Sequence, residues 1–344
     1  MNDVVDETWD FGLEEGERFE PLDEDEELDL SQPHVMTVLG PIDPGALGFT
    51  LHHEHVFNFV NPLAVDDPDQ ILDEPAASLT DLEIYFAAGG RAIVDMGPAD
   101  YGRSITDLLW IAQRAPVHIV QVTGHHKHLI AAPLFGESSV DDIVAHSVGE
   151  LTAGIEGTSA RAGLIKAGTS LDEITKVERR VLIAAAEAQR ATGAPISTHT
   201  EYGTMALAQM RVLTEAGADP RRVILCHLDF QLGNLPYLRE VLKTGAFISF
   251  DHWSKTRHAS DEARAAVFFK LADEGYLGQL LISGDLARKS NHPGYGGTPG
   301  FEYFLNHVPL MLMDAGFDAP SVRRIFVDNP ARALTIIPPT VIAV

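Results

Sequence analysis

Short apolar runs alternate with longer mixed segments along most of the chain. Turn residues and polar loops bound each run, which is typical of a buried strand. Eight such runs occur, at residues 49–55, 91–97, 117–124, 162–168, 195–201, 223–229, 246–252 and 280–285. The pattern therefore predicts eight short strands, separated by loops and by segments long enough to form helices.

The segments between the runs have the spacing of amphipathic helices. In the longest of them, apolar residues recur every three or four positions, and Gly193 follows as the expected residue just past a helix end. Ser170 and Glu173 have the spacing of a capping box and predict where this helix begins. Residues 203–219 and 260–276 show the same pattern. Helices are thus expected between the strands.

This alternation predicts the fold. Strands that alternate with helices form right-handed β–α–β units and a parallel sheet. Eight units in about 300 residues predict a (β/α)8 TIM barrel. The main alternative is an open doubly wound sheet, but no Gly-rich phosphate-binding turn follows the first run. Before that run, the turn residues GPIDPG separate two short β-like stretches and predict an N-terminal β-hairpin.

The negative charge of the chain is concentrated at its N-terminus. The 344 residues carry a formal charge of −25, and residues 1–30 contain fourteen Asp or Glu against Arg18 alone. A segment so acidic and so poor in apolar residues is expected to be a disordered tail, with a docking arm for a basic partner as the alternative. The predicted organisation is an acidic tail at 1–33 and one barrel domain at 34–344.

Composition excludes several classes of protein. An acidic chain without a basic stripe does not suit nucleic-acid binding. The chain contains no run of 18 or more apolar residues, so no membrane-spanning segment is expected. The acidic N-terminus lacks the features of a secretory signal. Cys226 is the single cysteine, so no intrachain disulfide is expected. We expect a cytoplasmic enzyme or binding protein for a small molecule, paired as a homodimer because such barrels often pair.

The candidate chemistry lies at the ends of the predicted strands. The stretch FTLHHEHVF favours a strand, in which His53 and His55 share one face while His52 and Glu54 share the other. Two imidazoles on one face could grip one metal ion. In a TIM barrel the strands end at a common mouth, where the active site lies. The polar residues at the strand ends are His53, His55, Lys166, His199, His227 and Asp285.

Each of these residues alone has an ordinary explanation, such as a hydrogen-bonded structural histidine, a surface lysine or a helix N-cap. Six on one rim favour a metal site instead. Imidazole and carboxylate suit Zn²⁺, with Mn²⁺, Co²⁺, Ni²⁺ or Fe²⁺ as competitors. Four histidines and an aspartate exceed what one tetrahedral ion needs and suit two ions. Because an ammonium group cannot bind a cation, Lys166 is expected to be N-carboxylated, as a carbamate can bridge two ions.

These residues carry a resemblance to a known family. Residues 35–338 resemble the phosphotriesterase-related group of the amidohydrolase superfamily through TVLGPIDPGALGFTLHHEHVF, GIEGTSARAGLIKAGTS, GAPISTHTE, CHLD, SGD and DNPARAL. The resemblance implies a two-metal hydrolase. Members of the group hydrolyse organophosphate triesters, lactones (including phosphorylated sugar lactones) and some carboxyl esters or amides.

The family pattern also implies roles for the strand-end residues. His53, His55 and Asp285 are implied to hold the more buried metal ion. His199 and His227 are implied to hold the more exposed ion, and the carboxylated lysine and a hydroxide are implied to bridge the two. The two-metal site would thus be shared among the ends of five strands.

The expected mechanism is direct attack by the bridging hydroxide. Asp285 is expected to accept the proton, and Lys166 acts with it as the bridge between the ions. No Ser or Cys nucleophile motif occurs, so no covalent intermediate is expected. Cys226 is expected to face away from His227 and to serve packing. Two alternatives stay open: a Schiff-base barrel enzyme that uses Lys166, and a binding protein that has lost turnover.

Two loops bear on the substrate. The candidate substrate-binding residues are His126, Lys127 and His128 after the third run, Arg288, Lys289 and Tyr295 after the last, and Tyr101 after the second. Cations around the mouth of an otherwise acidic protein favour an anionic substrate, with solvated loop charges as the alternative. The prediction is a hydrolase of a lactone or carboxyl ester, such as a sugar lactone phosphate. Organophosphate triester hydrolysis is the alternative within the class.

Overall fold

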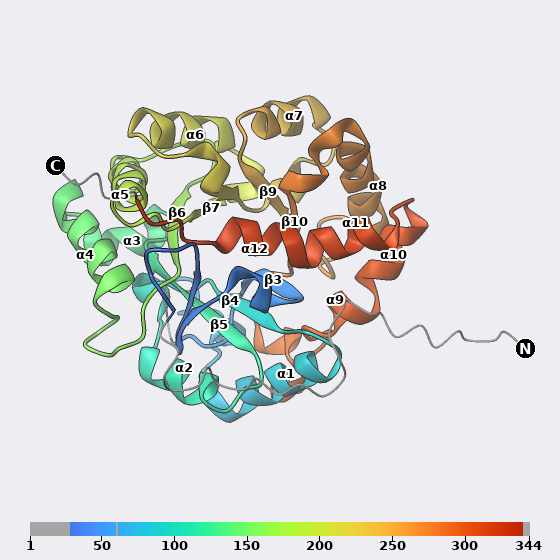
Figure 1. Cartoon of the computed structure of the whole chain (residues 1–344), viewed down its shortest axis with the longest axis horizontal. Helices are drawn as coiled ribbons and strands as arrows, with labels where there is room; N and C mark the ends of the chain where they lie inside the picture. The colour runs from blue at the N-terminus through green and yellow to red at the C-terminus, as the bar shows by residue number, and fades with distance from the viewer. Residues whose placement is uncertain (1–27, 60, 340–344) are drawn as a thin grey trace, which may run out of the picture.

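Eight parallel strands form the centre of the molecule (Figure 1). The computed structural model describes residues 28–59 and 61–339. The strands follow chain order around the sheet, and each pairs in parallel with the next. They are β3 (Thr50–Glu54), β4 (Ala92–Asp95), β5 (His118–Gly124), β6 (Leu164–Thr169), β7 (Ile196–Thr200), β8 (Val223–Leu225), β9 (Phe247–Phe250) and β10 (Leu280–Ile282). The (β/α)8 barrel prediction is confirmed.

Helices cover the outside of the barrel (Figure 1). They are α1 (Pro75–Ala87), α2 (Ile105–Ala112), α3 (His128–Phe135), α4 (Val140–Thr152), α5 (Lys176–Thr192), α6 (Ala206–Glu215), α7 (Leu235–Lys243), α8 (Asp261–Leu271), α9 (Tyr303–Asn306), α10 (Val308–Asp314), α11 (Ala319–Arg323) and α12 (Asn329–Leu334). Their apolar faces pack with outward-facing strand residues in one buried cluster that includes Leu51, Val181 and Phe268. This packing holds the strands in place from outside.

The N-terminal end of the barrel is closed by the hairpin and by α12. Strands β1 (Val35–Thr37) and β2 (Gly40–Ile42) pair antiparallel, which confirms the predicted hairpin. Figure 1 shows the hairpin and α12 lying across one end of the barrel. Val35 and Leu334 join strand residues such as Val120 in a second buried cluster inside the barrel. Apolar side chains thus fill this end of the barrel. Because the strands are parallel, their carboxyl ends, which carry the polar residues, meet at the opposite end.

Helix α5 begins later than its sequence pattern predicts. Thr175 is its N-cap: its side chain accepts from Glu178 N, and the Glu178 carboxylate accepts from Thr175 N at 2.7 Å. The predicted capping box at Ser170 and Glu173 is wrong, because these residues form an isolated β-bridge. Asp172 between them has φ 56°, in the left-handed region, so a right-handed helix cannot run through it.

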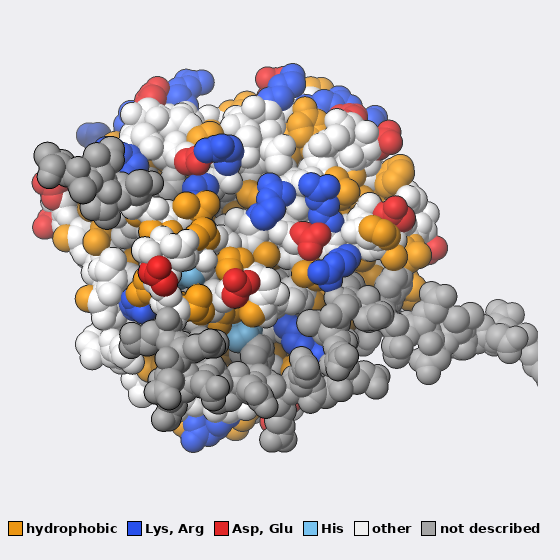
Figure 2. Space-filling view, in the orientation of Figure 1, with side chains coloured by type: hydrophobic (Ala, Val, Ile, Leu, Met, Phe, Trp, Pro, Cys, Tyr) orange, Lys and Arg blue, Asp and Glu red, His pale blue; other side chains and the backbone are white. Residues whose placement is uncertain are grey.

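The charge predictions meet the structure only in part. Most of the predicted acidic tail, at residues 1–27, lies outside the described residues. Figure 2 shows basic and acidic side chains interspersed over the described part of the face that carries α12. Within the part of the chain that the structure describes, no helix has the length and apolar character needed to cross a membrane.

Candidate metal centre

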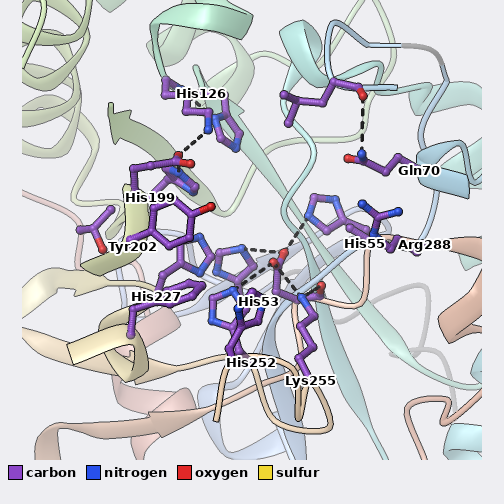
Figure 3. A pocket seen from close by; sticks show the side chains of 18 of the residues that line it. His53, His55, Gln70, His126, His199, Tyr202, His227, His252, Lys255 and Arg288 are labelled. Atoms are coloured by element: carbon purple, nitrogen blue, oxygen red, sulfur yellow. Dashed lines mark hydrogen bonds and ion pairs between the residues drawn. The ribbon is translucent and has the colours of Figure 1, made fainter. Parts of the chain in front are cut away.

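All six predicted metal ligands line one cavity of about 340 Å³. His53 and His199 lie near the carboxyl ends of β3 and β7, and Lys166 lies in the middle of β6. His55 follows directly after β3, and His227 and Asp285 lie two and three residues past the ends of β8 and β10. Figure 3 shows the four imidazoles directed toward the same space. The barrel closure therefore brings residues from five strands to one mouth.

His53, His55 and Asp285 form the first group. Asp285 Oδ1 lies 3.5 Å from His53 Nε2 and 3.2 Å from His55 Nε2. Burial lowers the pKa of His53 well below its usual value, so its imidazole is neutral, which is the form that binds metal. Asp285 has φ 46°, a costly conformation for a residue with a side chain, kept where the surroundings enforce it. The three side chains suit one cation.

His199 and His227 form the second group. Their ring centroids are 4.6 Å apart, and the His227 ring lies 5.0 Å from that of His53. Burial lowers the pKa of His199 to about 3, so this imidazole is neutral as well. His227 Nδ1 is 2.8 Å from Asp251 Oδ1, which leaves its Nε2 for a metal. The pair thus presents two nitrogens close to the first group.

Lys166 lines the same cavity and is 1% exposed. Among the described residues, none of the ion pairs includes its Nζ. Burial lowers the pKa of this amine below its usual value. An unpaired ammonium is costly inside a protein, whereas two neighbouring cations would favour an anionic group at this position.

The donor set fits two divalent ions. Among the described residues, three groups of His, Cys or Asp side chains have potential ligand atoms within 4.8 Å of one another. Each group includes His53 or His227. Neutral imidazoles and carboxylates are the ligand types that Zn²⁺ and its first-row competitors take. The six side chains at this cavity outnumber the four ligands of a single structural zinc site.

One predicted side-chain direction in β3 is wrong. His52 points into the barrel together with His53 and His55, and its Nε2 lies 2.9 Å from Ser249 Oγ. The register between β3 and β4 shifts between Leu51 and Glu54. Such an irregularity breaks the strict alternation of side chains, which the sequence-based argument assumed.

The predicted direction of Cys226 is also wrong, although its packing role is confirmed. Its Sγ lies within 4.8 Å of potential ligand atoms of His53 and Asp251, so it faces the barrel interior. His227 has φ 64°, outside the β region, and the alternation fails at this residue. Cys226 is fully buried and belongs to the apolar cluster inside the barrel.

A row of buried polar groups lies behind Asp285. Of its members, the sequence indicates His252 as a pocket residue, but Asp229 and Arg264 were missed by sequence reasoning. His252 Nε2 lies 3.9 Å from Asp285 Oδ2, and His252 Nδ1 lies 2.9 Å from Asp229 Oδ1. Arg264 Nε donates to Asp229 Oδ2 at 2.8 Å. The available signal for Asp229 was that it is the last residue of the predicted strand 223–229, as His252 is of the strand 246–252. The row connects Asp285 with a charged pair deep in the protein.

Two more charged residues contact the predicted ligands. Lys255 Nζ lies 3.1 Å from Asp285 Oδ2 (Figure 3). Glu201 Oε2 lies 2.7 Å from His199 Nε2 and also contacts Lys127 Nζ. Burial opposes ionisation of Glu201, but these two contacts lower its pKa to about 2. The cavity wall thus places fixed charges of both signs around the histidines.

The predicted substrate-binding residues divide into two sets. Tyr101, His126, Lys127 and Arg288 line the cavity. Arg288 Nη1 lies 2.7 Å from Asp67 Oδ2 at its rim. Sequence reasoning did not assign Lys255, Arg257 or His258 to the cavity, yet all three line it.

The other three residues lie outside the cavity lining. Lys289 Nζ pairs with Asp73 at 2.8 Å, and the Tyr295 hydroxyl accepts from Glu74 N at 2.9 Å. His128 starts α3. Loop neighbours such as Arg288 and Lys289 thus face different surroundings, which sequence position alone does not reveal.

The fold and the cavity define a class: a metal-dependent barrel hydrolase that acts on ester bonds. The sequence profile of the phosphotriesterase family matches residues 33–334. The chain therefore belongs to the phosphotriesterase family, which confirms the resemblance drawn from its motifs. A similar curated protein is the phospho-furanose lactonase of Mycoplasmopsis agalactiae, 31% identical over 332 residues, covering 89% of this chain and 93% of the relative.

Solved structures show the same likeness. A lactonase from Listeria monocytogenes is 35% identical, with a TM-score of 0.84, covering 88% of this chain and 99% of the other. The phosphotriesterase homology protein of Escherichia coli, solved with phosphate in its active site, is 32% identical, with a TM-score of 0.80. That match covers 85% of this chain and 99% of the other. Each of these matches covers most of both chains.

Proposed function

We propose that the protein hydrolyses a small lactone or carboxyl ester that carries a negative charge, such as a sugar lactone phosphate. The observation that carries the proposal is the meeting of four histidines, a buried lysine and an aspartate at one cavity. Lactone hydrolysis needs an activated water and stabilisation of the developing oxyanion, and a two-metal site suits both needs.

Each proposed ligand has a role in this scheme. His53, His55 and Asp285 would hold one divalent ion, His199 and His227 the other, and N-carboxylated Lys166 would contact both. When bound, such ions lower the pKa of a shared water and polarise the substrate carbonyl. The ligand set favours Zn²⁺.

The side chains themselves provide a route for the proton. Asp285 is placed to accept it from the attacking water, and its Oδ2 faces His252 Nε2 at 3.9 Å. Asp229 Oδ1, at 2.9 Å from His252 Nδ1, orients the imidazole and stabilises it when it becomes charged. Because His252 lines the cavity, the proton can continue to solvent or to the alkoxide that leaves the carbonyl.

The charge of the cavity wall supports an anionic substrate. Apart from Lys166, its lining contains four Lys or Arg and two Asp or Glu, whereas the chain as a whole has 25 Lys and Arg against 50 Asp and Glu. Lys255, Arg257 and Arg288 can donate charge-assisted hydrogen bonds to a phosphate. The relatives named for phospho-furanose lactone hydrolysis and solved with bound phosphate are consistent with such a substrate.

Three alternatives are less well supported. Organophosphate triester hydrolysis would use the same centre, but a neutral triester has no use for the excess of cations around the cavity. A Schiff-base enzyme would use Lys166 alone and would leave the four histidines without a role. Binding without turnover would not need the polar row behind Asp285.

The test combines metal analysis with a substrate panel. Protein purified without chelator is expected to contain about two divalent ions per chain by elemental analysis, and its intact mass in bicarbonate buffer to show one added CO₂. Lys166→Ala is expected to lose both ions, whereas Lys243→Ala, which removes an exposed lysine on α7, is expected to keep them. The panel compares a phosphorylated lactone, its unphosphorylated analogue and a phosphotriester.

The outcomes separate the alternatives. Two ions together with fastest turnover of the phosphorylated lactone would support the proposal. Fastest turnover of the phosphotriester would overturn the lactonase assignment in favour of phosphotriester hydrolysis. A protein that takes up no ion from added Zn²⁺ or Mn²⁺ with bicarbonate would overturn the two-metal mechanism.

A further inference from the structure

The seam of the barrel lies between its first and last strands, and it coincides with the first group of metal ligands. Pairing among the described residues runs from β3 through to β10, with no β3–β10 ladder. His53 and His55 lie on the β3 side of this seam, and Asp285 lies on the β10 side. The relative position of these three ligands therefore depends on whatever holds the seam together.

The side chain of Glu54 crosses this seam. Its Oε1 accepts from Ser283 Oγ at 2.6 Å and from Gly284 N at 2.5 Å, and its Oε2 accepts from Leu286 N at 2.8 Å. Glu54 is completely buried. The three donors come from the residues that flank Asp285 on both sides. The Glu54 carboxylate therefore holds, by hydrogen bonds, the turn that carries this ligand.

Two backbone groups of His53 complete the connection. His53 N donates to Ser283 Oγ at 3.1 Å, and Asp285 N donates to His53 O at 3.0 Å. Ser283 Oγ thus accepts from the chain next to Glu54 while it donates to the carboxylate. The hydrogen bonds also secure Asp285 in its left-handed conformation (φ 46°), which an unsupported aspartate would leave readily.

From these contacts we infer that Glu54 is a positioning residue for the metal ion held by His53, His55 and Asp285, acting as the clasp that closes the barrel at that site. The inference rests on the proposed two-metal function. It explains why a glutamate stands between the two histidines of the HEH stretch. Glu54 contacts neither the substrate cavity nor the proposed metal, since it does not line the cavity.

The test is Glu54→Gln, with Glu178→Gln as a matched control. An amide has one acceptor oxygen and places an NH₂ against one of the two N–H donors, so the clasp is broken. Glu178 is also buried and also accepts from one serine hydroxyl and two backbone N–H groups, those of Ser170, His128 and Thr175. It lies on α5, away from the seam. Ser283→Ala, which removes a single donor, provides a milder second variant at the seam.

The readout is metal content and metal affinity, measured by elemental analysis and by titration against a competing chelator. Wild-type protein and Glu178→Gln are expected to hold two ions per chain with equal affinities. Glu54→Gln is expected to retain about one ion and to bind the other roughly 10- to 100-fold more weakly, the usual effect of removing an outer partner of a metal ligand. Ser283→Ala is expected to weaken the same ion by a smaller factor.

The outcomes distinguish this inference from the proposed function. Two ions in the wild type with unchanged affinities in Glu54→Gln and Ser283→Ala would overturn the role of Glu54 alone. Equal weakening of both ions, in Glu54→Gln and Glu178→Gln alike, would show a general loss of structure and would also overturn it. A wild-type protein that binds no metal would overturn both the inference and the proposed function.

Discussion

At the scale of single residues, one carboxylate serves two proposed metal sites. Asp251 Oδ1 lies 2.8 Å from His227 Nδ1, and Asp251 Oδ2 lies 3.3 Å from His53 Nδ1. The two histidines belong to different ligand groups, and in each the Nε2 is left to face the cavity. The buried Asp251 carboxylate thus orients the His227 ring by a hydrogen bond and lies beside the ring of His53.

Arg288 and Lys289 are neighbours in the sequence, but only Arg288 lines the cavity, so the pair allows a matched test of substrate binding. Arg288 lines the cavity, whereas Lys289 is paired with Asp73 outside it. Arg288→Met is expected to raise the KM for a phosphorylated lactone by about 10- to 100-fold, since a charge-assisted hydrogen bond is lost. Steady-state kinetics with the phosphorylated and unphosphorylated lactones check this.

Lys289→Met is the control for this experiment. It removes a cation of the same loop and is expected to leave both KM values unchanged within twofold. The KM of the unphosphorylated lactone is expected to stay the same in both variants. An equal effect of Arg288→Met on the two lactones would show that Arg288 does not recognise the negative charge.

At the scale of elements, helix α5 (Lys176–Thr192) exists as predicted, but its N-terminus lies at a later residue than predicted. Both Ser170–Glu173 and Thr175–Glu178 have the spacing of a capping box. Only the second is used, because Asp172 takes a left-handed conformation and Thr175 an extended one. The end of α5 was predicted correctly, since Gly193 has φ 78°, where a residue without Cβ is favoured.

The stability of α5 tests this assignment. Thr175→Ala is expected to lower the free energy of unfolding by about 1 kcal/mol through loss of the cap. Glu173→Ala, at an exposed position outside the helix, is expected to change it by less than about 0.5 kcal/mol. Denaturant unfolding of the two variants measures the difference. The reverse order of effects would place the start of the helix at Ser170.

At the scale of the whole molecule, apolar side chains fill one end of the barrel, and the cavity with the proposed metal ligands lies at the other. Cys226 lies between these regions, fully buried and without a disulfide. A thiol reagent can reach it only when the barrel opens. The homodimer expected from the sequence stays a prediction.

Thiol labelling of Cys226 therefore reports on the coupling of metal binding and barrel opening. Metal present at 100 times its dissociation constant is expected to slow labelling by roughly 100-fold, since the open form does not bind it. Removal of the metal by chelator is expected to restore the fast rate and to lower Tm. Leu310→Cys, which places an exposed thiol on α10, is expected to react at once under both conditions. Labelling of Cys226 that ignores metal would show that the ions do not hold the barrel closed.

The sequence by itself determined the barrel, the hairpin and the six strand-end residues. Strand and helix periods follow from local burial, and parallel strands must end at one mouth, so residues such as His53 and Asp285 could be grouped without coordinates. The motifs also determined the family. Each of these features repeats or is local, which is why pattern reasoning reaches it.

Only the tertiary structure decided which polar groups touch. Glu54 and Ser283 are 229 positions apart, and their contact depends on how the barrel closes. The register shift in β3 and the left-handed residues His227 and Asp285 redirect side chains that strict alternation would place elsewhere. Such conformations are maintained by long-range packing and hydrogen bonds, against local preference, and no local pattern encodes them.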